Sequence, residues 1–222
     1  MRYLIVAAHP DDEVLGAGAT IHKLAKQGHE IYVCMMSHWS PTRDDNLEDG
    51  IRESHRILGV KKAYIGDFGC MRFKDADHHE IVRFIESCIK DCLPETLITH
   101  HPADIHVDHG ITAECCLEAA KLPQRGIIDI PKIRNISFME VPSSTDWNIN
   151  TSNGTFVANS FEEVTEHDIE AKIRAIEVYK DVMRSRPHPR SREALFAKAL
   201  CHGCKSGYEY AEAFQTVFRL GV

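Results

Sequence analysis

Two short polar segments carry residue types that can bind a metal ion and move protons. The first, Ala8-His9-Pro10-Asp11-Asp12-Glu13, follows the apolar run Tyr3–Ala7. The second, His101-Pro102-Ala103-Asp104-Ile105-His106-Val107-Asp108-His109, follows another apolar run about a hundred residues later. Ligands of open α/β sheets bind beyond the carboxyl ends of the strands. We therefore interpret the two segments as halves of one metal site.

The residue types in these segments match those of a zinc hydrolase. Such a site takes three ligands from His, Asp or Glu and leaves one position open for water. The metal lowers the pKa of that water towards ~7, and a neighbouring carboxylate can take its proton. His9 and Asp12 lie on a tight turn, close enough to bind one ion, and His109 can complete the set. Asp11, between the first two, can face the bound water as the general base.

A second histidine lies beside this predicted ligand set. His106 comes three residues before His109, and Asp108 falls between them. A histidine oriented by a carboxylate can stabilise an oxyanion and protonate a leaving amine. A single loop histidine is usually solvated, and a single aspartate before a helix is usually a cap. The joint pattern at two strand ends favours a catalytic metal site.

The elements that must position these residues alternate along the chain. Apolar runs typical of strands alternate with helical patterns, which indicates βαβ units and a parallel sheet in an α/β protein. The predicted strands are Tyr3–Ala8, Glu30–Met36, Lys62–Ile65, Thr96–Thr99 and Asn135–Val141. The predicted helices between them are Leu15–Gln27, Leu47–Leu58, His79–Cys92 and Ile111–Leu122.

The pattern changes after residue 142. Turn-rich residues 142–154 predict a loop, which can serve as a lid over the site. The remaining predicted elements are a strand at Phe156–Ala158, helices at Asp168–Met183 and Ser191–Leu200, and an edge strand at Ala213–Leu220. The chain contains no internal repeat and no long linker, so residues 1–222 are expected to form a single domain.

Composition narrows the possible functions. The net charge of −7 argues against nonspecific nucleic-acid binding, which needs a basic surface. No apolar run approaches a membrane span, and the first residues lack the pattern of a signal peptide, so a cytoplasmic location is expected. The eight cysteines are then expected to stay reduced. The lone Cys201-His202-Gly203-Cys204 motif has no second pair and is given no role.

These residues resemble the signatures of the LmbE-like, or PIG-L, family of zinc-dependent N-acetylglucosaminyl deacetylases. Between the two polar segments, Gly50-Ile51-Arg52-Glu53-Ser54 resembles the family segment whose arginine contacts substrate. The resemblance covers most of residues 1–112, and Tyr210–Phe214 also resembles the family. It implies a Rossmann-like, three-layer αβα fold with a mostly parallel sheet.

The resemblance also implies roles for individual residues. Carried over by position, it makes three residues the Zn²⁺ ligands, namely His9, Asp12 and His109. It makes Asp11 the general base and His106 both the oxyanion-stabilising group and the acid, with Asp108 orienting His106. Arg52 becomes the substrate contact.

The implied reaction is hydrolysis of the acetamide of an N-acetylated amino sugar, releasing acetate and a free amine. A GlcNAc-type glycoside or a sugar nucleotide is the expected substrate. Fe²⁺ is an alternative to zinc, because such a ligand set accepts several divalent ions. Neither a nucleic acid nor a membrane is expected as a partner, and a homo-oligomer is left open.

Other interpretations remain at this stage. The same residues would serve an amidase acting on a non-sugar N-acyl amine, or a non-catalytic sugar- or metal-binding module. A dinucleotide-dependent enzyme is not supported, since the GxGxxG pattern is missing after the first strand. Further candidate substrate contacts are Trp39, Arg43, and the arginines at 184, 186, 190 and 192. Trp39 could equally pack its loop against the core, and a solvated turn is the more common explanation for a run of arginines.

Overall fold

A computed structural model of the chain describes residues 1–38, 47–126, 128–149 and 154–221. Its strands form one seven-stranded sheet in the order β3-β2-β1-β4-β5-β7-β6. The strands are β1 (Arg2–Ala7), β2 (Glu30–Met35), β3 (Lys62–Ile65), β4 (Thr96–Thr99), β5 (Asn135–Met139), β6 (Ser160–Val164) and β7 (Tyr210–Arg219). The first five are parallel to one another, and β7 runs antiparallel to both β5 and β6.

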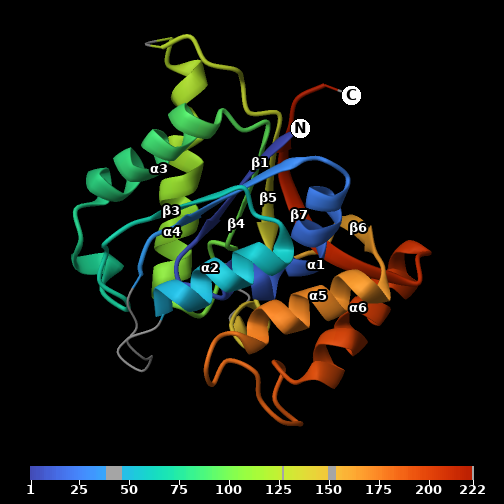
Figure 1. Cartoon of the computed structure of the whole chain (residues 1–222). Helices are drawn as coiled ribbons and strands as arrows, with labels where there is room; N and C mark the ends of the chain where they lie inside the picture. Colours follow the sequence, from blue (N-terminus) through green and yellow to red (C-terminus); the bar gives the residue numbers. More distant parts are fainter. Residues whose placement is uncertain (39–46, 127, 150–153, 222) are drawn as a thin grey trace.

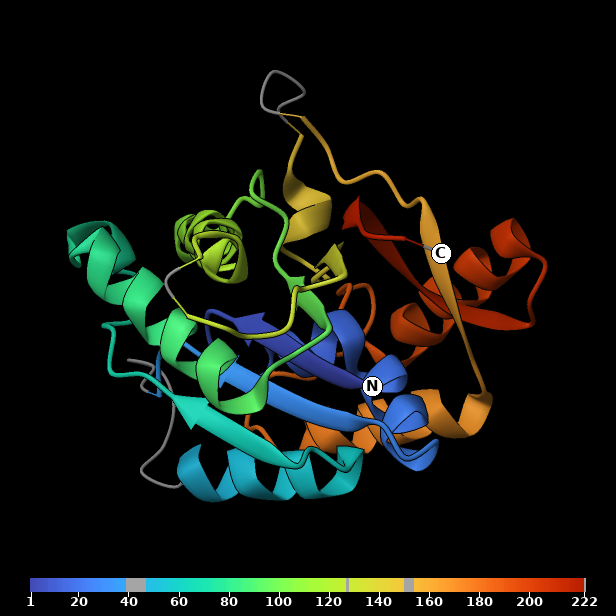
Figure 2. The same ribbon diagram turned by 90° about the horizontal axis from the view of Figure 1, so that it is seen from above.

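Helices cover both faces of this sheet (Figures 1 and 2). They are α1 (Asp12–Lys26), α2 (Leu47–Leu58), α3 (His78–Cys92), α4 (Val107–Ala119), α5 (Glu166–Glu177) and α6 (Arg192–Ser206). Helices α3 and α4 pack together on one face, whereas α1, α2, α5 and α6 share the other. The predicted three-layer αβα fold with a mostly parallel sheet is confirmed.

The central strand β1 shows how the two cores form. Its residues point alternately to opposite faces, so Leu4 and Val6 pack towards α3 and α4, while Ile5 and Ala7 pack towards α1 and α5. All four are at most 1% exposed. A parallel strand buried on both faces reads as a continuous apolar run, as this one does.

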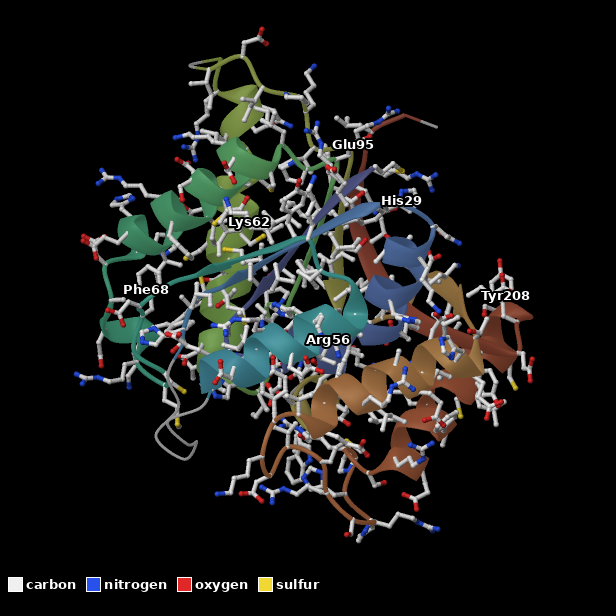
Figure 3. The ribbon with its side chains drawn as sticks, viewed as in Figure 1. His29, Arg56, Lys62, Phe68, Glu95 and Tyr208 are labelled. Atoms are coloured by element: carbon white, nitrogen blue, oxygen red, sulfur yellow. The ribbon has the colours of Figure 1, made fainter. Side chains whose placement is uncertain are left out.

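The sheet order brings the two polar segments together. Strands β1 and β4 are parallel neighbours in register from Tyr3↔Thr96 to Val6↔Thr99. The segments that follow them therefore leave the sheet side by side at its carboxyl edge. In Figure 3 the labels His29, just before β2, and Glu95, just before β4, identify the opposite edge of the sheet, where these strands begin. The label Phe68 lies near the carboxyl edge.

Several predicted boundaries are wrong at helix ends. Helix α1 begins at Asp12 rather than Leu15, since acidic residues are favoured in a first turn but lie outside the apolar periodicity. Helix α4 begins at Val107 rather than Ile111 for the same reason. Helix α5 starts after its Thr165 cap and ends at Glu177. It cannot extend to the predicted end at Met183, because Asp181 takes a φ of 60° that a right-handed helix does not include. Helix α6 continues to Ser206, where Gly207 terminates it.

The last strands also differ from the prediction. No strand lies at Phe156–Ala158 among the described residues; β6 begins at Ser160 instead. The predicted edge strand is β7, which lies between β5 and β6 and is therefore internal. Alternating side chains look the same in an internal antiparallel strand with one open face as in an edge strand.

One sheet contains strands from residue 2 to residue 219. For that reason we propose that residues 1–222 form a single domain. None of the helices in the described part of the chain is long and apolar enough to cross a membrane.

Candidate metal and catalytic site

The predicted ligands meet around one carboxylate oxygen at the carboxyl edge of the sheet. Asp12 Oδ2 lies 3.2 Å from His9 Nδ1 and 3.2 Å from His109 Nε2. His9 comes from the turn between β1 and α1, Asp12 is the first residue of α1, and His109 comes from the first turn of α4. Asp12 and His109 are each 2% exposed. The structure thus brings together three side chains that the sequence separates by about a hundred residues.

In each of the two histidines, the ring nitrogen that does not face Asp12 contacts a second carboxylate. His9 Nε2 lies 3.0 Å from Asp108 Oδ2, and His109 Nδ1 lies 3.2 Å from Asp104 Oδ2. Metal-binding histidines usually donate their second ring N–H to such a group, which fixes the ring and the tautomer. Here each ring consequently presents its other nitrogen towards Asp12.

The two backing carboxylates are themselves fixed by hydrogen bonds. Asp108 accepts from the backbone N–H groups of Met71 (2.5 Å) and Phe73 (3.2 Å). Asp104 accepts from the hydroxyls of Ser144 and Thr145, the latter at 2.7 Å. The first part of the predicted lid loop is therefore packed against the site. Sequence reasoning gave Asp104 no role; its place within the second polar segment was the signal available.

The contacts of Asp108 differ from the expectation that it orients His106. Its carboxylate bonds His9, and only its backbone N–H reaches His106, donating to Nδ1 at 3.3 Å. Burial and the neighbouring His109 lower the pKa of His106, which favours the neutral ring. Because Nδ1 accepts, the ring proton lies on Nε2. His106 stacks on His109 with ring centroids 4.6 Å apart.

His100, at the end of β4, is a further buried histidine that the sequence did not single out. Its ring stacks on His109 at 4.0 Å between centroids, and its Nε2 accepts from the Ala8 N–H at 2.9 Å. Burial lowers the pKa of His100 to about 3, so the ring stays neutral. The ligand atoms of His100, Asp12 and His109 lie within 4.8 Å of one another, as do those of His9, His106 and His109. These two sets share His109, so they belong to one centre.

Asp11 sits in an uncommon backbone conformation with φ 102° and ψ −26°. For a residue other than glycine this costs about 1–3 kcal/mol, and such strain is concentrated at functional sites. Glu13 Oε2 accepts the Asp11 N–H at 3.2 Å, and Glu13 Oε1 lies 2.9 Å from His55 Nε2. Asp11 is 2% exposed and lies next to the predicted ligands.

Of the four arginines between residues 184 and 192, Arg190 is placed at this site. Its Nη1 lies 3.7 Å from Asp11 Oδ2. Its Nε donates to the hydroxyl of Ser143 at 2.8 Å and to the carbonyl of Pro142 at 3.3 Å. Arg192, by contrast, pairs with Glu170 on the outside of the molecule.

Arg52 lies on α2, with its side chain 75% exposed and Nη1 3.0 Å from Asp49 Oδ1. Together with His38 and His55 it lines a surface groove. His55 connects this groove to Asp11 through Glu13. The predicted contacts Trp39 and Arg43 lie outside the described residues.

The charges of the centre match those of a bound divalent cation. Burial opposes protonation of His9, but hydrogen bonds to Asp108 and Asp12 raise the pKa of His9 to about 12. Burial is likewise outweighed at His109, where Asp12 and Asp104 raise the pKa to about 9. Both rings are therefore positively charged imidazolium groups, with a proton on each nitrogen, when no cation is bound. A divalent cation can displace one proton from each ring without changing the total charge, so the donor set fits such an ion.

The fold and the site together define an α/β protein with a two-histidine, one-carboxylate centre at the carboxyl edge of its sheet. Residues 4–120 match the family model "PIG-L: GlcNAc-PI de-N-acetylase", which is more than half of the chain. The chain therefore belongs to the PIG-L family, as the sequence predicted.

Two relatives show how far the similarity extends. A protein of Escherichia coli K12 described as the uncharacterized deacetylase YaiS is 27% identical over 191 residues, covering 80% of this chain and 89% of that protein. The 1D-myo-inositol 2-acetamido-2-deoxy-alpha-D-glucopyranoside deacetylase 1 of Catenulispora acidiphila is 27% identical over 176 residues, covering 60% of this chain. The match spans about half of the length of that relative, 54%.

Two solved structures share the fold. The N,N'-diacetylchitobiose deacetylase of Pyrococcus horikoshii aligns with a TM-score of 0.76 at 22% identity, covering 97% of this chain and 83% of its own. GalB of Pseudomonas putida, a 4-carboxy-2-hydroxymuconate hydratase, aligns with a TM-score of 0.76 at 21% identity, covering 100% and 98%. The fold thus occurs with two different reactions, so the reaction must be argued from the site.

Proposed function

We propose that this protein is a zinc-dependent N-deacetylase that hydrolyses the acetamide of an N-acetylated amino sugar. The observation that carries the proposal is the buried cluster in which two carboxylate-backed histidines face Asp12, with Asp11 and His106 beside them. Family membership and the deacetylases among its relatives support the same reaction.

In this proposal His9, Asp12 and His109 hold the cation. Two imidazoles and one carboxylate are the usual ligand types of catalytic zinc sites. When bound, the ion would supply polarisation of the amide carbonyl and a water of lowered pKa. Asp108 and Asp104 act as positioning residues, because they fix the rings of the two histidine ligands.

The remaining steps fall to the chain's own side chains. Asp11 takes a proton from the attacking water and passes it to the amide nitrogen as the C–N bond breaks. The water oxygen forms the new bond to the carbonyl carbon, giving acetate and a free amine. His106, with Nδ1 occupied by the Asp108 N–H, can donate from Nε2 to the developing oxyanion.

The substrate class is proposed from the relatives and from the site rim. The Catenulispora relative and the Pyrococcus structure are named for acetamido-sugar substrates, which favours a GlcNAc-type glycoside here. Arg190 lies beside Asp11 and can bind a hydroxyl or an anionic group of the sugar. Arg52 is proposed as a second contact from the adjoining groove. A cytoplasmic location stays a prediction.

The direct test is acetate release from free GlcNAc, a GlcNAc glycoside, UDP-GlcNAc and simple N-acyl amines. We expect metal-dependent release from one of the sugars, falling at least 100-fold in an Asp11→Ala variant. An Asp129→Ala variant, changed at an exposed aspartate, serves as the matched control and should keep full activity. Turnover of the simple amines alone would establish the amidase instead. Failure to release acetate from any of them would refute the proposed function.

A further inference from the structure

The thiol of Cys70 lies close to His9 and to Asp108, the carboxylate that contacts His9 Nε2. It lies in the segment between β3 and α3, close along the chain to Phe68, which is labelled in Figure 3. Ligand atoms of His9, Cys70 and Asp108 all lie within 4.8 Å of one another. His9 and Asp108 are already in contact, with Nε2 and Oδ2 3.0 Å apart. Cys70 is half-buried, so the group is reachable from solvent.

The segment that carries Cys70 is attached to the site by its backbone. The N–H of Met71, the next residue, donates to Asp108 Oδ2 at 2.5 Å, and the N–H of Phe73 donates to Oδ1 at 3.2 Å. These bonds hold the Cys70 main chain against the same carboxylate that contacts His9. The backbone on either side of the thiol is therefore fixed beside His9 while the Cys70 side chain can still rotate, unlike the situation of a lone surface cysteine.

The three donor types define the class of ligand. We propose that His9, Cys70 and Asp108 form a second cation site, which takes a thiophilic divalent cation such as Zn²⁺, Cd²⁺ or Co²⁺. Thiolate and imidazole ligands together select such ions over Mg²⁺ or Ca²⁺. In a tetrahedral zinc site neighbouring ligand atoms are roughly 3.4–3.7 Å apart, so a small movement of the Cys70 side chain closes the site. Binding displaces the thiol proton and the proton on His9 Nε2 to solvent.

The second site competes with the first because both use His9. The proposed catalytic ion needs Nδ1, which faces Asp12, whereas the second ion needs Nε2, which faces Asp108. A neutral imidazole has one free lone pair and can ligate through one nitrogen at a time. Occupation of the second site therefore takes His9 from the first and inhibits the enzyme at excess metal. The binding part of this inference is independent of the proposed deacetylation.

A cobalt titration tests the site without any activity measurement. The exposed Cys201 and Cys204 on α6 are first replaced by serine, so that they do not contribute thiolate signals. In that background, with reductant present, we expect Co²⁺ to give a sulfur-to-metal charge-transfer band in the near ultraviolet. A further Cys70→Ser change should remove this band and leave the weaker visible bands of cobalt held by the first site. Absence of the band in the background protein, or its persistence in Cys70→Ser, would overturn the proposal.

A kinetic comparison tests the competition separately. Once a deacetylase substrate is known, we expect excess Zn²⁺ to inhibit the protein, and Cys70→Ser to raise the inhibiting concentration at least tenfold. Activity at one equivalent of Zn²⁺ should be unchanged, since Cys70 is not among the proposed catalytic groups. Equal inhibition of both proteins would refute competition for His9, whereas lack of deacetylation would refute the proposed function and leave the cobalt result standing.

Discussion

At the scale of single residues, four aspartates that meet at the site make different contacts there. Asp12 faces a ring nitrogen of each proposed ligand, His9 and His109, while Asp104 and Asp108 contact the other nitrogen of these rings. Asp11 lies beside Arg190, with Oδ2 3.7 Å from Nη1. The four residues should therefore separate into groups when each is replaced by its amide.

We expect Asp104→Asn and Asp108→Asn to weaken metal binding by about 10–100-fold, because each loses the charge that orients a ligand histidine. Asp11→Asn should leave the metal dissociation constant nearly unchanged and lower kcat strongly. Isothermal titration with Zn²⁺, together with acetate-release kinetics at saturating metal, measures both quantities. Normal affinity in the first two variants would show that the backing carboxylates do not set the histidine geometry.

At the scale of elements, a half-buried ion pair joins the end of β5 to α6. Glu140, just after β5, has Oε1 2.8 Å from Lys198 Nζ and Oε2 3.2 Å from His202 Nε2. Burial would raise the pKa of Glu140, but these partners outweigh it and lower the pKa to about 2. His202 is the middle of the Cys201–Cys204 motif, so in this structure the motif contributes a histidine to packing while both cysteines are exposed.

This pair predicts a defined pH dependence of stability. A carboxyl whose pKa is lower in the folded chain stabilises the fold above its unfolded pKa, near 4.5, and loses that contribution as the pH falls towards 2. Glu140→Gln should therefore lower the free energy of unfolding by up to about 3 kcal/mol at pH 7. The difference from wild type should shrink progressively between pH 4.5 and pH 2. Urea unfolding across this range measures it.

The matched control is Glu53→Gln, since Glu53 makes an exposed pair with Arg56 on α2. Exposed pairs contribute little to stability, so this variant should follow wild type at every pH. A Glu140→Gln deficit that persists undiminished at pH 2.5 would mean that packing, not charge, causes the loss.

Helix α2 offers a second comparison at this scale, between two arginines one turn apart. Arg52 and Arg56 both line the groove, are similarly exposed at 75% and 72%, and each pair with an acid three residues earlier. Because their surroundings are alike, replacing either arginine should affect catalysis differently only if one of them contacts the substrate. We expect Arg52→Ala to raise KM about tenfold with kcat little changed, while Arg56→Ala leaves both constants unchanged. Indistinguishable kinetics of the two variants would remove Arg52 from the substrate site.

The sequence predicts some elements and site residues of this protein correctly and misses others, and the arrangement of the elements explains the difference. Strand β1 and the residues His9 and Asp12 were predictable because a continuous apolar run ends in a contiguous polar motif. The starts of α1 and α4 were not, since acidic site residues occupy their first turns and break the apolar period. The roles of Asp104 and Arg190 depend on contacts with residues at 142–145, about 40–50 positions away in sequence. No local pattern contains such information.

At the scale of the whole molecule, a buried ion pair connects the C-terminal strand to the helices of one layer. Glu212 on β7 has Oε1 2.6 Å from Lys172 Nζ on α5, with the two side chains 8% and 10% exposed. The same carboxylate accepts from the backbone N–H groups of Ala19 (3.2 Å) and Thr20 (2.7 Å) on α1. Gly18 allows this close approach, because a Cβ there would lie 2.9 Å from Lys172 Cγ. Strand β7 is thus attached to α1, the helix that begins at the proposed metal centre.

This arrangement predicts strong coupling in a double-mutant cycle. Lys172→Met and Glu212→Gln should each destabilise the protein by about 3–5 kcal/mol, because each leaves a buried polar partner without its counterpart. The double variant should lose markedly less than the sum, since neither charge then remains. Chemical denaturation of the four proteins gives the coupling energy, with metal saturation held constant because ligand binding shifts apparent stability. Strict additivity would mean that Glu212 stabilises α1 through the Ala19 and Thr20 N–H groups alone, and that Lys172 contributes only its aliphatic packing.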